Sequence, residues 1–329
     1  MALDDELKEA ETVEQLREAL RRSQHAERKA RHRTDEMVAA VYQAAKDAAL
    51  SLRPLRFEAP KKQQGTGAEV ALIHATDWQL GKRTGDYDIK TCQQRIRTFA
   101  DKVCEITDIQ RKHHPVNEAV LMLGGDMVEG TSIFAGQAWE VEATLYEQLF
   151  QTVNTMSALV HRLASHFPDL RIVCEYGNHG RIGKYGEGPR ADNVDRMAYE
   201  IVRKQWVDLD WQLSDDWYQH FSIGKYRVLL VHGDEIRSFS GTPLFAIIKR
   251  VTAWGAGVVP AFDDCYMGHW HNPLSVTLGN GNRAFITGSP ESGNVYAQEH
   301  LAAQARPSQR LHFIDPHKGR VTSEHVIWL

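Results

Sequence analysis

Side chains that could bind metal ions occur in five short segments, in one order and at wide spacing. The segments are Asp77-Trp78-Gln79, Gly125-Asp126, Gly177-Asn178-His179, His232-Gly233-Asp234 and Gly268-His269-Trp270-His271. Carboxylate, amide oxygen and imidazole ligands suit Mn²⁺, Fe or Zn²⁺ better than Ca²⁺ or Mg²⁺, which prefer sets made only of oxygen. Together, the five segments predict a site for two metal ions.

His269 and His271 are separated by a single residue. In an extended segment, alternate side chains point to the same side of the chain. We therefore expect both imidazoles to reach a pair of ions that are about 3.5–4 Å apart.

Each of the first four segments directly follows an apolar run of the kind that forms a buried strand. These runs are residues 72–76, 120–125, 172–177 and 228–231. A strand end followed by a loop is where α/β sheets place their binding residues, because rigid strands hold several loops over one edge. Ligands that are far apart in the sequence can therefore converge.

The order of apolar runs predicts a mixed α/β fold. Strands expected at 70–75, 119–123 and 171–176 alternate with helices near 90–112, 140–166 and 192–205, which is typical of βαβ units and a parallel sheet. Later strands are expected to be short and closely spaced, at 220–223, 226–231, 265–267, 274–278, 284–287, 311–314 and 322–327. We therefore predict two mixed β-sheets flanked by helices.

Residues 1–52 differ in composition from the rest, with no Gly or Pro. Apolar residues at steps of three or four predict a helical extension. Acids dominate residues 4–18 and bases 21–33, which suits a solvated helix but leaves open a coiled coil or contact with a nucleic-acid backbone. Residues 53–68 contain prolines and glycines and are predicted to be a linker. We expect residues 69–329 to form the catalytic domain.

Composition sets broad limits on the 329-residue chain. A formal charge of -4 neither favours nor excludes a nucleic-acid partner. No apolar run approaches the roughly 18 residues needed to span a bilayer, and the acidic N-terminus lacks a secretory apolar region. We therefore expect a cytoplasmic protein with no membrane partner. The four cysteines lack the paired spacing of a zinc cage or redox motif and are expected to be reduced core thiols. They are Cys92, Cys104, Cys174 and Cys265.

As an ordered set, the five segments resemble the calcineurin-like metallophosphoesterase superfamily over residues 70–290. Its pattern is Asp-x-His, Gly-Asp, Gly-Asn-His, a later His and Gly-His-x-His. The resemblance implies the superfamily's fold, two mixed β-sheets packed as a sandwich flanked by helices. It also implies how the metals are held. Asp77, Gln79 and His271 would hold the first, Asn178, His232 and His269 the second, and Asp126 would bridge both.

The same resemblance implies that Asn178 and His179 are catalytic. His179 would contact the substrate phosphate and assist the leaving group, and Asn178 would help to neutralise the phosphate oxygens. The implied reaction is attack of a metal-bound hydroxide on phosphorus. Two divalent ions are thus the expected cofactors, with Mn²⁺ preferred and Fe, Zn²⁺ or Mg²⁺ as alternatives.

Two positions depart from the superfamily's pattern. Gln79 stands where His is usual, and because an amide oxygen is a weaker donor to transition metals, we expect a looser first site. His74 is a poor substitute, since its odd separation from Asp77 directs the two side chains to opposite faces of a strand. Gly180 stands where many members have an acid. Another carboxylate, such as Asp192, is therefore expected to orient His179.

A narrower resemblance concerns the substrate. Residues 125–130, 177–181 and 287–290 are similar to those of phage-type metallophosphoesterases, which in turn are similar to the nuclease subunit of bacterial double-strand-break repair complexes. This implies a phosphodiesterase with DNA, or another phosphodiester, as its partner. Arg181 is a candidate phosphate clamp, and Lys82 and Arg83 could extend a basic rim along the backbone.

Two other functions remain open at this stage. One is a phosphatase or cyclic-nucleotide phosphodiesterase that acts on small or protein substrates. The other is a non-catalytic assembly scaffold, although a scaffold would have no need of His179 and the metal ligands. The N-terminal helix could also assemble the chain as a homo-oligomer.

Overall fold

The computed structural model describes residues 18, 20–22, 24, 25, 29, 36, 39–51, 53–131, 133, 134, 137–183, 186, 188–237, 243–293 and 306–329. The chain divides into two compact units, Met1–Lys46 and Asp47–Leu329. Every described residue up to position 51 is helical. The remainder of the helix expected over residues 1–52 lies outside the described residues.

The first sheet of the larger unit has six strands in the order β11-β10-β1-β2-β3-β4. Its parallel part consists of β1 (Val70–Ala75), β2 (Glu118–Leu123), β3 (Asp169–Cys174) and β4 (Asp210–Leu213). β10 (Ser308–Asp315) and β11 (Arg320–Trp328) add antiparallel at the β1 edge. This sheet is therefore mixed.

The second sheet has five strands in the order β5-β6-β7-β9-β8. Its strands are β5 (Gln219–Ile223), β6 (Tyr226–Leu230), β7 (Asp264–Met267), β8 (Leu274–Thr277) and β9 (Arg283–Ile286). β6, β7 and β9 are parallel, whereas β5 and β8 pair antiparallel at the two edges. The carboxyl ends of the three parallel strands thus point in one direction.

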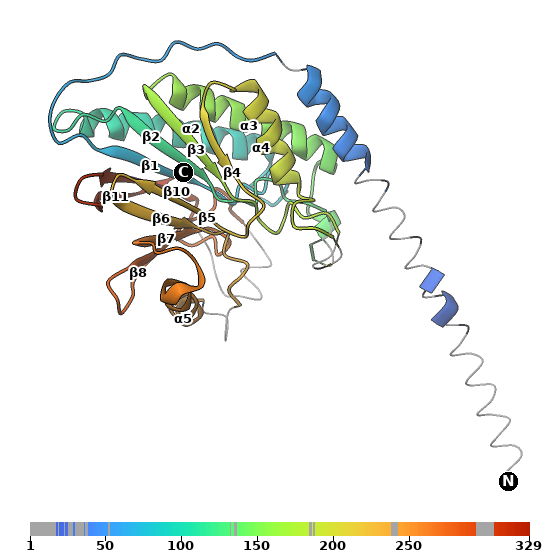
Figure 1. The fold of residues 1–329 in the computed structure, drawn as a ribbon. Helices are drawn as coiled ribbons and strands as arrows, with labels where there is room; N and C mark the ends of the chain where they lie inside the picture. Colours follow the sequence, from blue (N-terminus) through green and yellow to red (C-terminus); the bar gives the residue numbers. More distant parts are fainter. Residues whose placement is uncertain are drawn as a thin grey trace, which may run out of the picture. The chain divides into compact units, whose positions relative to one another are not determined.

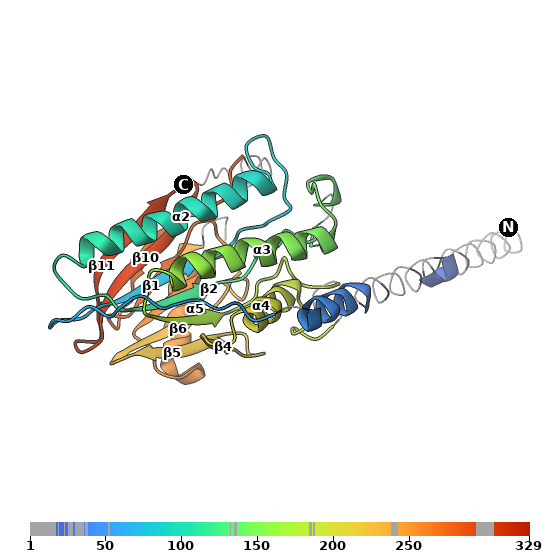
Figure 2. The same ribbon diagram turned by 90° about the horizontal axis from the view of Figure 1, so that it is seen from above.

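Helices cover the outer faces of both sheets (Figures 1 and 2). α2 (Ile89–Gln110), α3 (Leu145–Ala164) and α4 (Val194–Gln205) lie over the first sheet. α5 (Leu244–Ala253) and a π-helical turn, η2 (Trp254–Val258), lie over the second, and a 3₁₀ turn, η1 (Gln137–Trp139), precedes α3. α3 begins five residues later than predicted, because Thr144 and Glu147 form a capping box that fixes its start.

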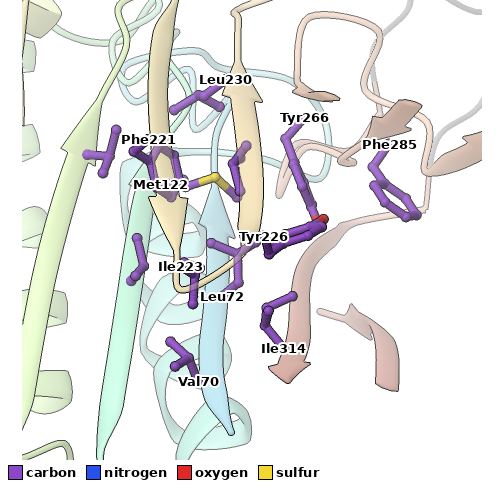
Figure 3. Packing of buried hydrophobic residues seen from close by; sticks show 13 residues of the cluster. Val70, Leu72, Met122, Phe221, Ile223, Tyr226, Leu230, Tyr266, Phe285 and Ile314 are labelled. Atoms are coloured by element: carbon purple, nitrogen blue, oxygen red, sulfur yellow. The ribbon is translucent and has the colours of Figure 1, made fainter. Parts of the chain in front are cut away.

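The core between the two sheets is a continuous apolar layer (Figure 3). Leu72 of β1 and Met122 of β2 meet Phe221 and Leu230 of the second sheet in one cluster of buried residues. Burying one such side chain contributes about 1.5–3 kcal/mol, so this layer is a main source of stability. The predicted fold class, two mixed sheets packed as a sandwich and flanked by helices, is confirmed.

Residues 53–68 form neither helix nor strand, yet they are tied to the larger unit. The N–H of Leu55 donates to the carbonyl of Gln205 at 2.8 Å, and the ring of Phe57 lies 5.7 Å from that of Trp206. Gln63 and Asn117 exchange hydrogen bonds of 2.7 and 3.0 Å. The segment predicted as a linker therefore runs along the surface of the larger unit.

All four cysteines are buried free thiols, which confirms their predicted role. Burial raises the pKa of the Cys92 thiol to about 12, which keeps it protonated and unreactive. Among the described residues, no helix combines the length and apolar character that a membrane span requires.

Candidate metal centre

The ends of β2, β3, β6 and β7 bring the predicted ligands of the second metal together. His232 Nε2 lies 3.0 Å from Asp126 Oδ2 and 3.2 Å from Asn178 Oδ1. One ligand atom from each of Asp126, His232 and His269 falls within 4.8 Å of the others. Carboxylate, amide and imidazole atoms therefore converge on a single point, as a metal site requires.

The predicted ligands of the first metal form a neighbouring cluster. His271 Nε2 lies 3.3 Å from Asp77 Oδ1 and 3.0 Å from Gln79 Nε2. Gln79 is 2% exposed, and its buried Oε1 has no hydrogen-bond partner among the described residues. Because a buried amide oxygen without a partner is costly, this atom fits a role as metal ligand. The two amide atoms are assigned from their surroundings, so either orientation of the group brings it to His271.

Asp126 links the two clusters. Its backbone carbonyl accepts the N–H of Gln79 at 2.9 Å, while its carboxylate lies in the cluster with His232. The neighbouring carbonyl of Gly125 accepts the N–H of Asp77, also at 2.9 Å. The structure thus brings the seven predicted ligands into two groups, with the Asp126 carboxylate in the group of His232 and its backbone carbonyl bonded to Gln79 of the other group. That Asp126 bridges two ions stays a prediction.

Five of these residues have left-handed backbone conformations. The φ angles of Asp77, Gln79, Asp126, His269 and His271 are 54°, 44°, 53°, 63° and 57°. Among the described part of the chain they are the full set of non-glycine residues with positive φ. Such a conformation is uncommon outside glycine, costs on the order of 1–3 kcal/mol per residue, and tends to cluster at functional sites. The strain here is therefore concentrated on the predicted metal ligands.

The segment that holds His269 and His271 is not extended, contrary to the prediction. The N–H of Trp270 donates to the carbonyl of Gly268, and that of Asn272 to the carbonyl of Trp270, both at 2.7 Å. These tight turns replace the alternation of a strand. They deliver His269 to the Asp126 cluster and His271 to the Asp77 cluster.

Glycines leave room for the ligand carboxylates. A Cβ atom on Gly177 would lie 2.1 Å from Asp126 Oδ1, and one on Gly268 would lie 2.0 Å from Asp77 Oδ2. Any side chain at either position would displace a carboxylate. The glycines that precede Asn178 and His269 in the motifs are therefore explained by close approach rather than by backbone conformation.

The second ring nitrogen fixes the orientation of two imidazoles. His232 Nδ1 lies 2.8 Å from the carbonyl of Gly124, which leaves Nε2 facing Asp126. His271 Nδ1 lies 3.1 Å from Glu291 Oε2, which leaves Nε2 facing Asp77. Such partners set the tautomer and strengthen a histidine as a metal ligand. Glu291, which no sequence motif marked, directly follows the 287–290 segment, which itself follows β9.

Lys82 does not extend a basic rim, so this prediction is wrong. The side chain is buried, and its Nζ lies 2.8 Å from Glu291 Oε1. Lys82 and His271 together lower the pKa of Glu291 to about 2, despite the opposing effect of burial. Lys82 therefore keeps the Glu291 carboxylate, which orients His271, in its charged form.

Replacing Glu291 by Gln should weaken the first metal site. The amide cannot accept from both Lys82 and His271 as the carboxylate does, and loss of such a partner costs about 10- to 100-fold in metal affinity. Calorimetric titration of the metal-free protein with Mn²⁺ measures this, with the exposed Glu58→Gln as matched control. Equal affinities for the two variants would show that Glu291 does not support the site.

A buried carboxylate organises the loops around Asp126. Asp195, at the start of α4, accepts the backbone N–H groups of Asp126, Val128 and Gly177 at 2.8, 3.2 and 3.1 Å. It holds the loops after β2 and β3 against each other and so fixes the distance between Asp126 and Asn178. No motif in the sequence marked this residue.

The residues at the start of α4 also explain why a glycine stands at position 180, where many members of the superfamily have an acid. A Cβ atom there would lie 2.3 Å from Asn193 Oδ1 and 3.0 Å from Asp195 Cγ. Asn193 caps α4 and also donates to the carbonyl of Gly177 at 2.8 Å. An acid at position 180 would therefore collide with the residues that hold the loop.

His179 is oriented by Glu129 and not by Asp192, which corrects the prediction. His179 Nδ1 lies 2.8 Å from the backbone carbonyl of Glu129 and 3.3 Å from its Oε2. Gln137 holds this carboxylate by donating to Oε1 at 3.0 Å. The backbone N–H of His179 donates to Asp126 Oδ1 at 2.7 Å, which ties the imidazole to the metal centre.

The carboxylates around His179 favour its charged form. Burial alone would lower the pKa of His179, but Asp126 and Glu129 outweigh it and raise the pKa to about 9. Nδ1 is engaged by Glu129, so Nε2 is the atom that can give a proton to a bound molecule. The arrangement suits a general acid.

Metal binding should release protons. Burial would lower the pKa of His232 and His271, but Asp126 raises the first well above its ordinary value, and Asp77 and Glu291 raise the second to about 10. A ligand imidazole must be neutral, so metal affinity should rise with pH up to these pKa values, by about tenfold per pH unit for each proton released. Calorimetry in buffers of different ionisation enthalpy counts the protons. No release at pH 7 would contradict these pKa directions.

The structure places the three predicted substrate-binding residues differently. Arg181 lines a cavity of about 590 Å³ that also contains Asn178 and His269. Arg83 is exposed, and its backbone N–H donates to the carbonyl of Glu140 at 2.7 Å. Arg181 thus lines one cavity with two predicted metal ligands, and Lys82 is engaged with Glu291. The role of Arg83 stays a prediction.

No protein-family profile matches the chain, and no curated relative matches it. Solved structures to which the chain is similar include Vps29 complexed with Zn²⁺ from Entamoeba histolytica, at 12% identity and a TM-score of 0.35, covering 78% of this chain and 98% of that one. A metallophosphoesterase from Sphaerobacter thermophilus has 14% identity and a TM-score of 0.34, covering 78% and 88%. An uncharacterised Streptococcus pneumoniae protein described as a predicted phosphoesterase has 12% identity and a TM-score of 0.30, covering 79% and 98%.

Identities and TM-scores this low say nothing about activity or ligands. A functional conclusion must therefore come from the residues of the site.

Proposed function

We propose that this protein is a phosphoesterase that depends on two divalent metal ions and hydrolyses phosphodiester bonds, with DNA as its substrate. One observation carries the proposal: the predicted ligands form two clusters, one with Asp126 beside His232 and one with Asp77 beside His271, and a histidine oriented as a general acid donates its backbone N–H to Asp126. If these residues had only a structural role, the fold would not need strained backbone at five of the predicted metal ligands.

The donor set fits two transition-metal ions. Asp77, Gln79 and His271 would hold one ion, Asn178, His232 and His269 the other, and Asp126 both. Bound there, the ions would lower the pKa of water and neutralise the charge of a phosphate group. Mixed oxygen and nitrogen donors favour Mn²⁺, Fe or Zn²⁺ over Ca²⁺, and we expect Mn²⁺.

The protein's own residues supply the remaining chemistry. His179 Nε2 gives a proton to the departing oxygen, while Glu129 holds Nδ1 and stabilises the imidazolium beforehand. Asn178 and Arg181 line the cavity beside the ligands, where an amide and a guanidinium can donate to phosphate oxygens. His179 is only 13% exposed at its side chain, so water competes poorly for the proton.

Purified protein with Mn²⁺ should cleave single- or double-stranded DNA and the small diester bis(p-nitrophenyl) phosphate. Removal of metal with a chelator should stop both reactions. A phosphomonoester is tested beside them. Intact DNA with cleavage of a small ester would reject DNA as the substrate in favour of a phosphatase or a small-molecule phosphodiesterase. If none of the esters is hydrolysed, the proposal that the protein is an enzyme is rejected.

A further inference from the structure

A hollow leads away from the metal centre toward α5. Beside the ligands Asn178 and His269, the cavity of about 590 Å³ contains three arginines and two acids. The arginines are Arg181, Arg237 and Arg250, and the acids are Asp234 and Glu235. The cavity therefore connects the predicted second metal site with residues that play no part in binding the metal.

A second cavity, of about 550 Å³, adjoins the first at Arg237 and Arg250, which line both. Its other walls include Phe245 and Lys249 of α5. The surface thus passes from metal ligands through paired arginines to an aromatic ring and a lysine. We call Arg237, Phe245, Lys249 and Arg250 the α5 track.

The packing of α5 explains why these side chains face outward. Ile247 and Val251 are buried in the apolar cluster on the outer face of the second sheet. Because these two residues are buried, the opposite side of α5 faces solvent. Phe245 and Lys249 are four residues apart and so lie on one face of the helix. Phe245 is 77% exposed, an unusual position for a phenylalanine that lines a cavity.

The charges on the α5 track are available to a ligand. Arg237, Lys249 and Arg250 are exposed, and among the described residues no ion pair engages them. Of the two acids in the cavity, Glu235 is already engaged by Arg190 at 3.4 Å and by the N–H of Gly233 at 3.1 Å. The other acid, Asp234, lines the same cavity as His269, and divalent ions held there would offset its charge.

From this arrangement we infer that the α5 track binds the single-stranded nucleic acid that flanks the scissile phosphodiester. This inference rests on the proposed function. Arg237 and Arg250 hold a phosphate next to the one that is cleaved, and the ring of Phe245 stacks on an unpaired base. In a duplex the faces of the bases are already stacked on one another, so Phe245 selects a single strand.

The test is binding of a fluorescein-labelled oligothymidylate, followed by anisotropy. All variants are made in the His179→Ala background and loaded with Mn²⁺, so that the ions are present and cleavage is slow. Phe245→Ala should weaken binding by about tenfold or more. Arg250→Ala should also weaken binding. It should make the slope of log binding constant against log salt concentration shallower by about 0.7. Both positions are exposed, so both variants should fold, and circular dichroism verifies this. Exposed residues of β11 provide the matched controls, Trp328→Ala and Arg320→Ala, which should bind as His179→Ala alone does.

The inference would be overturned if the Phe245→Ala variant bound the oligothymidylate as tightly as the Trp328→Ala control. So would an equal loss of affinity for the single strand and for a duplex of the same length. Hydrolysis of bis(p-nitrophenyl) phosphate by the unmodified protein reports the proposed function separately. If that ester is cleaved while the variants bind the oligothymidylate normally, the α5 track does not bind single-stranded DNA, and the proposed phosphoesterase activity stands. If the ester is not cleaved, the proposed function fails, whatever the binding shows.

Discussion

Replacing Asp126 by Asn should lower kcat/KM for phosphodiester hydrolysis by about 10³-fold or more. The change removes the negative charge that both proposed metal sites would share, while an amide oxygen can still accept the N–H of His179. Metal content after loading with Mn²⁺ and dialysis should fall below that of the unmodified protein. Mass spectrometry of the metals and assays with bis(p-nitrophenyl) phosphate measure the two effects.

Asp208→Asn is the matched control, since Asp208 is an exposed carboxylate. It should keep full metal content and full activity. Asp126→Asn should remain folded, because Asp195 still accepts the backbone N–H groups of the surrounding loops. Unchanged hydrolysis in Asp126→Asn would refute the shared metal centre.

Replacing His179 by Ala should lower kcat for DNA by about 10²- to 10⁴-fold, because an alkoxide leaving group needs a proton. The loss should be much smaller for bis(p-nitrophenyl) phosphate, whose nitrophenolate leaves without one. Metal content should be unchanged, since His179 meets the centre through its backbone N–H. The exposed His113→Ala serves as control.

The dependence on leaving group separates a proton donor from a residue that only shapes the site. An equal loss for both substrates would show that His179 positions the phosphate rather than donating a proton. A loss of metal would show that it supports the ligands.

Much of the fold, and the clustering of the candidate ligands, could be predicted from the sequence, because strand ends carry local signals. β1 lies where it was expected, at Val70–Ala75, and the ligands Asp77 and Asp126 follow their strands within a few residues. An apolar run followed by a polar motif is visible along the chain without knowledge of tertiary contacts.

Residues that support the ligands could not be predicted, because their roles depend on contacts distant in sequence. Asp195 is 69 residues from the Asp126 N–H that it accepts, and Glu129 was visible only as part of the 125–130 segment. Lys82 looked like a surface charge until the structure placed it against Glu291. A lone charged residue carries no sign of its burial.

α5 was missed for a different reason. Residues 244–253 contain Ile247, Ile248 and Val251, β-branched residues that weaken a helical pattern, and their apolar face was not recognised. The α5 track depends on which side of this helix is buried, so it became visible only in the structure.

The most direct test of the central claim is anomalous diffraction from crystals of the protein grown with Mn²⁺. The account predicts two anomalous peaks in each chain. One should lie among Asp77, Gln79 and His271, the other among Asn178, His232 and His269, and both should be within bonding distance of Asp126. A single peak, or peaks away from Asp126, would contradict a centre of two metal ions.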